Sequence, residues 1–295
     1  MPVTWSTLRR PFLFTIGFGA CSFGGAAIWQ YENMRQSASE NWKRKKSKAH
    51  ELLQSWGMNV PIEKSGKIRQ ELNKYWNELS EGEKIFLPIL GLNVLVFGLW
   101  RVPSLQPLMY RYFAANPQIS NSGAPMLLSA FSHCSFLHLA CNMFVLHSFS
   151  GPIVSALGKE QFLGLYLSSS VLTSFFSHVS KIASGRMGSS LGASGAICTI
   201  LGVFGTLVPD ARMQIIFLPF FTFTASMGIK ALMALDTAGL IAGWQIFDHA
   251  AHLSGVLFGI WWCHQGHALI WHRRGDLMNW WHENVRDGKH PPSER

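Results

Sequence analysis

The sequence predicts an all-α polytopic membrane protein with seven transmembrane helices, one near the N-terminus and six in a following bundle. Only 14% of the 295 residues are charged, whereas a soluble domain carries about 25%. The charges avoid several long runs, and an apolar run of about 20 residues is typical of a helix that crosses a bilayer. The uncharged runs are 11–30, 112–158, 161–180, 187–209 and 249–272.

The first transmembrane helix is predicted within residues 1–30, at about 11–30, in a run rich in glycine and alanine. A polar connector follows at 31–84. Apolar residues at helical spacing in this connector predict an amphipathic helix: Ile68, Leu72, Tyr75, Trp76 and Leu79. The sequence from Ser80 to Glu83 has the S-x-x-E pattern of a capping box, so we expect the next helix to begin there.

The membrane domain is predicted at 85–270 and contains six helices. They lie at about 84–102, 134–156, 161–180, 192–208, 230–246 and 249–268. Residues 212–228 are apolar but contain Pro219, so we interpret them as a partly immersed connector. Residues 271–295 form a C-terminal tail, and the tryptophans on both sides of residue 271 are typical of a membrane interface.

The net charge of +9 does not indicate a nucleic-acid partner. Eleven of the 25 basic residues lie in 31–84, among eight acidic ones. A basic stretch beside a transmembrane helix more often meets anionic lipid headgroups, and a solvated loop fits equally well. The chain has five cysteines without a CxxC pair, and it has no H-E-x-x-H motif. We therefore expect no metal and no other cofactor.

Polar side chains are costly in membrane helices and suggest a function there. One such group is Gly192-Ala193-Ser194-Gly195, at the start of the helix predicted at 192–208. Because glycine has no Cβ atom, a G-x-S-G turn allows backbone N–H groups to approach a reacting carbonyl. Taken alone, the pattern fits a packing seam of small residues better than a catalytic serine.

A second group surrounds His252. Gly255 and Gly259 follow it at i+3 and i+7, on the same helical face. The glycines allow a neighbouring helix to approach where the imidazole lies. A single histidine in a membrane helix is more often a hydrogen-bonded packing residue. His249, beside Asp248 at the start of this helix, is interpreted as structural.

A third group contains His133, His138 and Asn142. His138 and Asn142 are four residues apart and share a helical face. Both side chains can donate hydrogen bonds, which an oxyanion requires. The competing interpretation is hydrogen bonding between helices.

The three groups together favour nucleophilic catalysis over packing. A serine hydroxyl needs a base to become nucleophilic, and His252 would supply one to Ser194 without a fixed charge in lipid. A buried aspartate would be costly as a third member, so we expect a two-residue dyad. Donors on another helix would complete an acyl-transfer site.

This constellation resembles the rhomboid family of intramembrane serine proteases, and the likeness covers roughly 85–270. Mitochondrial members of that family are similar in three further runs and in the extra N-terminal helix. The runs are Leu99–Gln106, Ser190–Ala196 and Phe247–Leu253. The resemblance implies a rhomboid-like six-helix bundle with one additional helix, in a multi-pass protein of the mitochondrial inner membrane.

The resemblance also implies a hydrolase that cuts peptide bonds in or near transmembrane segments of membrane proteins. Ser194 would attack, His252 would act as the base, and His138, Asn142 and the Ser194 amide would stabilise the oxyanion. Supporting roles would fall to His133, Gly192, Gly195, Gly255 and Gly259. The partners would be transmembrane substrates and the lipid bilayer, with no nucleic acid and no cofactor.

Two positions depart from the family pattern. Leu127–Phe131 replaces a Trp-Arg pair found in bacterial members, and Cys198 replaces a tyrosine that stacks on the catalytic histidine. The orientation of His252 would therefore depend on other contacts. An inactive rhomboid-like protein that binds helices without cutting them is the alternative. A transporter fits less well, because Asp236 is the one clear acid in the predicted helices.

The sequence leaves open which side of the membrane the site faces. The basic connector at 31–84 favours the matrix or cytoplasmic side by the positive-inside rule, whereas the resemblance places it on the opposite side. The substrate and the oligomeric state are also left open.

Overall fold

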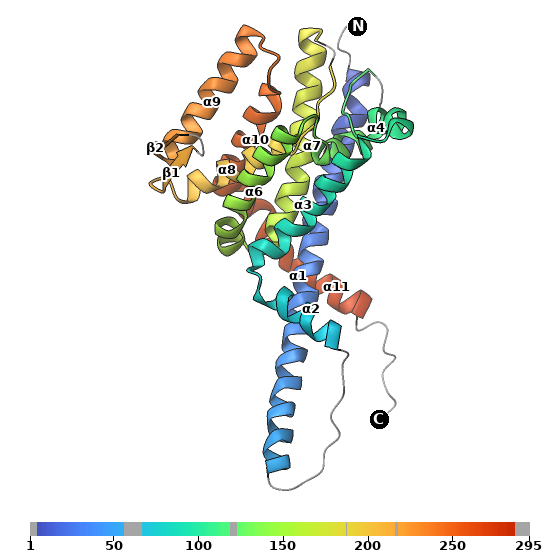
Figure 1. Ribbon diagram of the computed structural model, residues 1–295. Helices are drawn as coiled ribbons and strands as arrows, with labels where there is room; N and C mark the ends of the chain where they lie inside the picture. The colour runs from blue at the N-terminus through green and yellow to red at the C-terminus, as the bar shows by residue number, and fades with distance from the viewer. Residues whose placement is uncertain (1–4, 56–66, 119–122, 187, 216–217, 287–295) are drawn as a thin grey trace.

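The computed structural model describes residues 5–55, 67–118, 123–186, 188–215 and 218–286. Figure 1 shows a helical bundle from which one end of the first helix projects. Within these residues, five helices are long and apolar enough to cross a membrane. They are α1 (Trp5–Ser55), α3 (Glu81–Leu99), α6 (Phe136–Leu157), α7 (Lys159–Ser184) and α9 (Ala225–Ala242).

Two shorter helices complete the bundle: α8 (Ser194–Leu207) and α10 (His249–Trp261). The second continues without a break as the π-helical segment η3 (Trp262–Trp271), which brings it to spanning length. The predicted all-α polytopic fold, with one helix followed by six, is confirmed.

The remaining described elements are short. The helical ones are α2 (Lys67–Glu78), η1 (Pro103–Leu105), α4 (Gln106–Tyr112), α5 (Ala124–Leu128), η2 (Ser129–Phe131), α11 (Arg274–Trp281) and η4 (His282–Arg286). The strands are β1 (Arg212–Ile215) and β2 (Leu218–Thr224).

The predicted elements on the N-terminal side of α3 are present. Helix α2 lies where the amphipathic helix was expected, with Tyr75 and Trp76 exposed. Helix α3 begins at the predicted capping box. The Ser80 hydroxyl accepts from the Glu83 amide at 3.2 Å, and the Ser80 amide donates to the Glu83 carboxylate at 2.8 Å.

Helix α1 is longer than predicted, because it continues through Ser55 instead of ending near residue 30. The polar stretch after residue 30 contains no proline or glycine before Gly57, so nothing in it stops the helix. Parts of several predictions lie outside the described residues: 1–4 of the N-terminal segment, 56–66 of the connector, 119–122, 187 and 216–217 of the membrane domain, and 287–295 of the tail.

Helix α1 packs along α7 and the C-terminal elements. The Phe23 ring stacks on Trp262 with centroids 4.5 Å apart. A Cβ atom added to Gly164 of α7 would lie 3.1 Å from the Ala26 side chain, so the two helices are in close contact. In the predicted tail, Trp281 donates to the Glu32 carboxylate at 3.0 Å. The first helix is thus part of the bundle.

The segment predicted as an immersed connector forms an antiparallel β-hairpin between α8 and α9. Its register pairs Arg212 with Thr224 and Met213 with Phe223. Pro219 disfavours a helix here, and the aromatic and β-branched residues that follow it favour an extended strand. Phe220 is fully exposed at the surface of the protein.

Candidate active site

Ser194 is the first residue of α8, and the preceding loop is held from both sides. Gly192 has a φ of +124°, a conformation that L-residues with a side chain rarely adopt. Its amide donates to the Ser129 carbonyl at 2.9 Å. The next amide, of Ala193, donates to His133 Nε2 at 3.5 Å. These contacts fix the direction in which the chain enters α8.

His133 is fully buried beside this loop. Burial, together with the nearby His138 ring, lowers the pKa of His133 to about 3. The ring is therefore neutral, and its Nε2 atom can accept the Ala193 amide.

His252 lies in the first turn of α10, directly opposite Ser194. Its Nε2 atom is 2.8 Å from Ser194 Oγ, a hydrogen-bond distance. Both side chains lie at the N-terminal ends of their helices, where the backbone N–H groups of the first turn have no acceptor within the helix. The structure brings these two predicted residues together across 58 positions of sequence.

Glycines allow α8 and α10 to approach until their backbones are in contact. A Cβ atom at Gly255 would lie 2.3 Å from the Gly195 carbonyl oxygen, and one at Gly259 would lie 2.3 Å from that of Thr199. On the other side, a Cβ atom at Gly195 would meet the Thr173 hydroxyl of α7 at 2.4 Å. We call the α8–α10 contact the glycine seam, defined by Gly195, Gly202, Gly255 and Gly259.

Asp236 of α9 lies behind the histidine and was not assigned to the site from sequence. Its Oδ1 atom is 3.4 Å from His252 Nδ1 and 2.7 Å from His249 Nδ1. The residue is only 1% exposed. Of these two contacts, the one to His249 Nδ1 is a hydrogen bond, and the Oδ2 atom of Asp236 is buried without a partner among the described residues. The sequence predicts a two-residue dyad; in the structure an acid also faces the Nδ1 atom of His252. The signal was present, since an acid within a membrane helix is itself a functional indication.

Other groups flank the His252 ring where the family pattern has a tyrosine. Cys198, in the tyrosine position, is buried against Gly255. The His252 ring has Phe247 at 6.1 Å between centroids and Asp236 at its Nδ1 atom.

Of the two predicted oxyanion donors, His138 lies closer to the serine loop. A Cβ atom at Gly192 would be 3.0 Å from His138 Nε2, so the ring covers that glycine. His133 and His138 meet edge to face with ring centroids 4.8 Å apart. The Asn142 amide donates to the His138 carbonyl at 3.0 Å, one turn back along α6. That bond uses one of the two amide hydrogens of Asn142.

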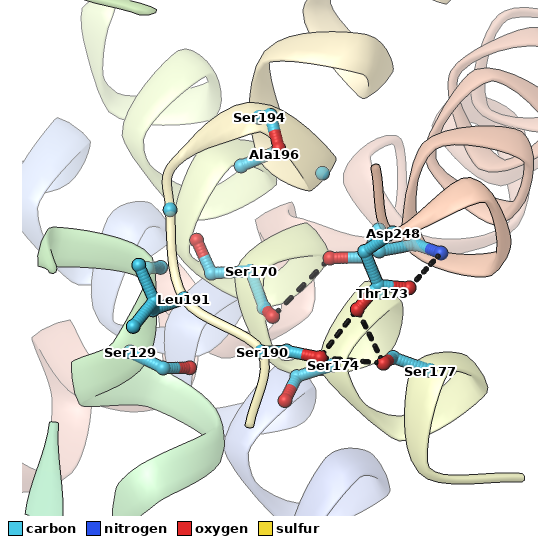
Figure 2. Close-up of a pocket in the computed structure, with 14 residues that line it drawn as sticks. Ser129, Ser170, Thr173, Ser174, Ser177, Ser190, Leu191, Ser194, Ala196 and Asp248 are labelled. Atoms are coloured by element: carbon cyan, nitrogen blue, oxygen red, sulfur yellow. Dashed lines mark hydrogen bonds between the residues drawn. The ribbon is translucent and has the colours of Figure 1, made fainter. Parts of the chain in front are cut away.

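A small polar cavity lies beside Ser194 (Figure 2). Its volume is about 30 Å³, enough for about two water molecules. Hydroxyl groups from α7 line one wall, contributed by Ser170, Thr173, Ser174 and Ser177. Hydroxyl groups of this kind can hydrogen-bond water.

Comparisons with known proteins decide the family. Residues 121–267 match the Rhomboid domain. The mitochondrial presenilin-associated rhomboid-like protein of Mus musculus is 52% identical over 287 residues, which cover 97% of this chain and 74% of the relative. This chain belongs to the rhomboid family.

Other rhomboids extend the comparison. The Homo sapiens presenilin-associated rhomboid-like protein is 51% identical over the same shares of both chains. Rhomboid protein 1, mitochondrial, of Saccharomyces cerevisiae is 36% identical over 176 residues, which cover 58% of this chain and 50% of the relative. With these relatives and its apolar helices, this rhomboid is a multi-pass mitochondrial membrane protein.

Proposed function

We propose that this rhomboid is an intramembrane serine endopeptidase with Ser194 as nucleophile and His252 as general base. The observation that carries the proposal is the 2.8 Å contact between Ser194 Oγ and His252 Nε2 at the start of two tightly packed helices. A serine within hydrogen-bond reach of a base that a third group orients is the signature of an activated nucleophile.

The chemistry follows the acyl-transfer pattern. His252 Nε2 takes the Ser194 proton as Oγ attacks the substrate carbonyl, and then gives that proton to the leaving amine. The resulting ester would be hydrolysed by water from the hydroxyl-lined cavity, with His252 again acting as the base. Release of the carboxylate product would return Ser194 to its free hydroxyl form.

The oxyanion would be stabilised by groups on the far side of Ser194. The Ser194 amide is one of the unpaired N–H groups at the start of α8. His138 lies over Gly192, and Asn142 shares its helical face with one amide hydrogen to spare. Fixed donors of this kind are most effective where water is largely excluded.

Asp236 would orient the base. A proton on His252 Nδ1 that faces Asp236 leaves Nε2 free to accept from Ser194, which is the tautomer that catalysis requires. His249 Nδ1 lies 2.7 Å from the same carboxylate oxygen. The proposed catalytic unit is therefore the Ser194–His252 pair together with the supporting carboxylate of Asp236.

The proposed substrates are transmembrane segments of proteins in the mitochondrial inner membrane. The carbonyls of an intact helix are hydrogen-bonded, so the segment must unwind locally before Ser194 can attack. Glycine and proline lower that cost by about 1 and 3 kcal/mol relative to alanine. Small residues at the cut would fit beside Gly192 and Gly195. Substrates in which the helix-breaking glycine and proline residues are progressively replaced by leucine should be cut more slowly. Equal cleavage rates across such a series of substrates would contradict this substrate class.

The activity is tested with the purified full chain and a single-pass membrane substrate, with product termini identified by mass spectrometry. Ser194→Ala should abolish cleavage while the protein still inserts and folds. Ser148→Ala is the matched control, because Ser148 is an exposed α6 serine bonded to the Phe144 carbonyl. Normal cleavage by Ser194→Ala would refute the assignment. Substrate binding without cleavage by the wild type would favour an inactive helix-binding rhomboid.

A further inference from the structure

Four polar side chains meet where the serine loop, α7 and α10 converge, and Figure 2 shows three of them, Ser177, Ser190 and Asp248, lining the cavity. They come from three segments: Ser177 and Lys181 from α7, Ser190 from the loop before α8, and Asp248 from the N-cap of α10. We call them the mouth cluster. The function proposed above gives Ser177 only a place in the cavity wall and assigns the other three no role.

The Asp248 carboxylate is the centre of the mouth cluster. Its Oδ2 atom accepts a hydrogen bond from Ser177 Oγ at 2.5 Å and another from Ser190 Oγ. The Ser177 and Ser190 hydroxyls are 2.8 Å apart. Lys181 donates to Ser190 and its Nζ atom lies 3.7 Å from Asp248 Oδ2.

The other oxygen of the same carboxylate holds the histidine helix. Asp248 Oδ1 accepts from the Ala251 amide at 3.2 Å and thereby caps α10. The Asp248 carbonyl accepts from the His252 amide at 3.0 Å. One carboxylate therefore contacts the serine loop through one oxygen and the first turn of the histidine helix through the other.

The spacing makes this connection direct. Ser190 precedes Ser194 by four residues of loop, and Asp248 precedes His252 by four residues, about one turn of α10. The backbone of Ser190 is fixed by two reciprocal hydrogen bonds of 2.9 Å with Ala115. A contact between Ser190 and Asp248 thus joins two short chain segments. One segment ends at Ser194 and the other ends at His252.

The charges favour an ionised Asp248. Burial acts to raise the pKa of its carboxyl, but the Lys181 ammonium and the Ser177 and Ser190 hydroxyls outweigh it and hold that pKa below its ordinary value. The Lys181 and Asp248 side chains are 17% and 24% exposed, so salt screens their attraction less than that of a surface pair.

We propose that Asp248 is a positioning residue, which sets the distance between Ser194 and His252 by clamping the serine loop to the N-terminus of α10, with Lys181 as its counter-ion. This inference rests on the proposed function. Asp248 differs from Asp236, because it acts on the two backbones and not on the imidazole ring. The competing interpretation is an ordinary helix cap, which contributes to stability alone.

The test is the rate at which a fluorophosphonate labels Ser194 in the purified full chain, because this reaction reads nucleophile activation without a substrate helix. Asp248→Asn keeps the shape of the side chain but removes its charge. It should slow labelling about 10- to 100-fold, the scale expected when reacting groups are slightly misplaced. Substrate kinetics should show the same fall in kcat with little change in KM. Ser190→Ala should have a smaller effect of the same kind.

Two further variants separate positioning from stability. Because Ser190 and Asp248 act through one bond, Ser190→Ala should slow labelling little further when added to Asp248→Asn. The matched control is Thr224→Ala, which removes the side-chain cap of α9 far from the mouth cluster in sequence. It should lower thermal stability and leave the labelling rate unchanged.

Each outcome bears on a different claim. Wild-type labelling rates for Asp248→Asn and Ser190→Ala, below their unfolding temperatures, would overturn the positioning role and leave a simple cap. Fully additive effects of the two variants would also overturn it. Failure of the reagent to label Ser194 in the wild-type protein would contradict the proposed function, and this inference would then fail as well.

Discussion

Helices α8 and α9 follow each other in the chain but are held in different ways. Nine of the 14 residues of α8 are buried, whereas α9 buries four of its 18. Helix α8 lies in the centre of the bundle, and α9 stands at its edge (Figure 1). Ile241, near the end of α9, is 83% exposed, which suits contact with lipid.

Both helices nevertheless contribute to the site. Helix α8 carries Ser194 on a segment whose backbone touches that of α10 across the glycine seam. Helix α9 reaches His252 through the single carboxylate of Asp236. Under the proposed function, this difference leads us to expect that main-chain packing and the Asp248 link hold the serine–histidine distance, whereas the peripheral helix α9 orients the imidazole. Variants of the seam should affect mainly stability, and variants of Asp236 should affect mainly activity.

The largest effect is expected at the reacting pair. His252→Ala should reduce cleavage as far as Ser194→Ala does, on the order of 10⁶-fold where background allows it to be measured. The double variant should be no worse than either single variant, since the two groups act as a unit. Cleavage rates of purified proteins test this. Substantial activity in His252→Ala would mean that another group acts as the base.

The next effect concerns α6, whose His138 ring lies over Gly192 of the serine loop. His138→Ala should slow cleavage by about 100- to 1000-fold, the usual cost of one oxyanion donor. Asn142→Ala should cause a smaller defect, because the Ser194 amide and His138 remain. The control is His147→Ala on the same helix, whose ring packs on Phe86. If His138→Ala and Asn142→Ala both cleave at the wild-type rate, these residues serve only in hydrogen bonding and packing between helices.

Asp236→Asn isolates the contribution of α9. It should lower kcat on the order of 100-fold, less than the roughly 10⁴-fold loss known for a triad carboxylate, because His249 and Phe247 still flank the ring. Thr237→Ala is the matched control on α9, since its hydroxyl bonds to the Met233 carbonyl. An unchanged kcat in Asp236→Asn would mean that Asp236 serves only as a hydrogen-bond partner of His249.

The smallest expected effect on rate, but a clear effect on stability, belongs to the glycine seam. Gly255→Ala places a methyl group against the Gly195 carbonyl and should destabilise the fold by about 1–3 kcal/mol. Gly91→Ala on α3 has open space around it, so it should be neutral or stabilising by up to about 1 kcal/mol. Unfolding in detergent measures both. Equal stabilities would show that the seam tolerates a wider spacing.

The sequence carries the parts of this fold that depend on local rules. The capping box at Ser80 and Glu83 needs only a four-residue pattern and its geometry is present. The spanning helices follow from hydropathy, because lipid requires every backbone group to be paired. The end of α1 was missed because polar residues alone do not stop a helix, and the hairpin was missed because its pairing is decided between segments.

The site divides in the same way. Ser194 and His252 stand in recognisable local patterns, so each could be selected from sequence. Asp236 lies 16 positions before His252 and on a different helix, and no spacing rule predicts that their side chains meet. The link between Ser190 and Asp248 is equally non-local, since it joins segments 58 residues apart. The residues of the site could be selected from the sequence, but the contacts that they make between helices could not be predicted from it.

The most direct test of the central claim is the covalent adduct of a peptide chloromethyl ketone. Such a reagent adds its ketone to an activated serine and alkylates the adjacent histidine with loss of chloride, so it reacts at two residues only when they form one working pair. We expect mass spectrometry of the digested full chain to find one inhibitor joining the peptides that contain Ser194 and His252, with loss of the adduct in either alanine variant. An adduct at another serine, in a protein that still cleaves its substrate, would contradict the account.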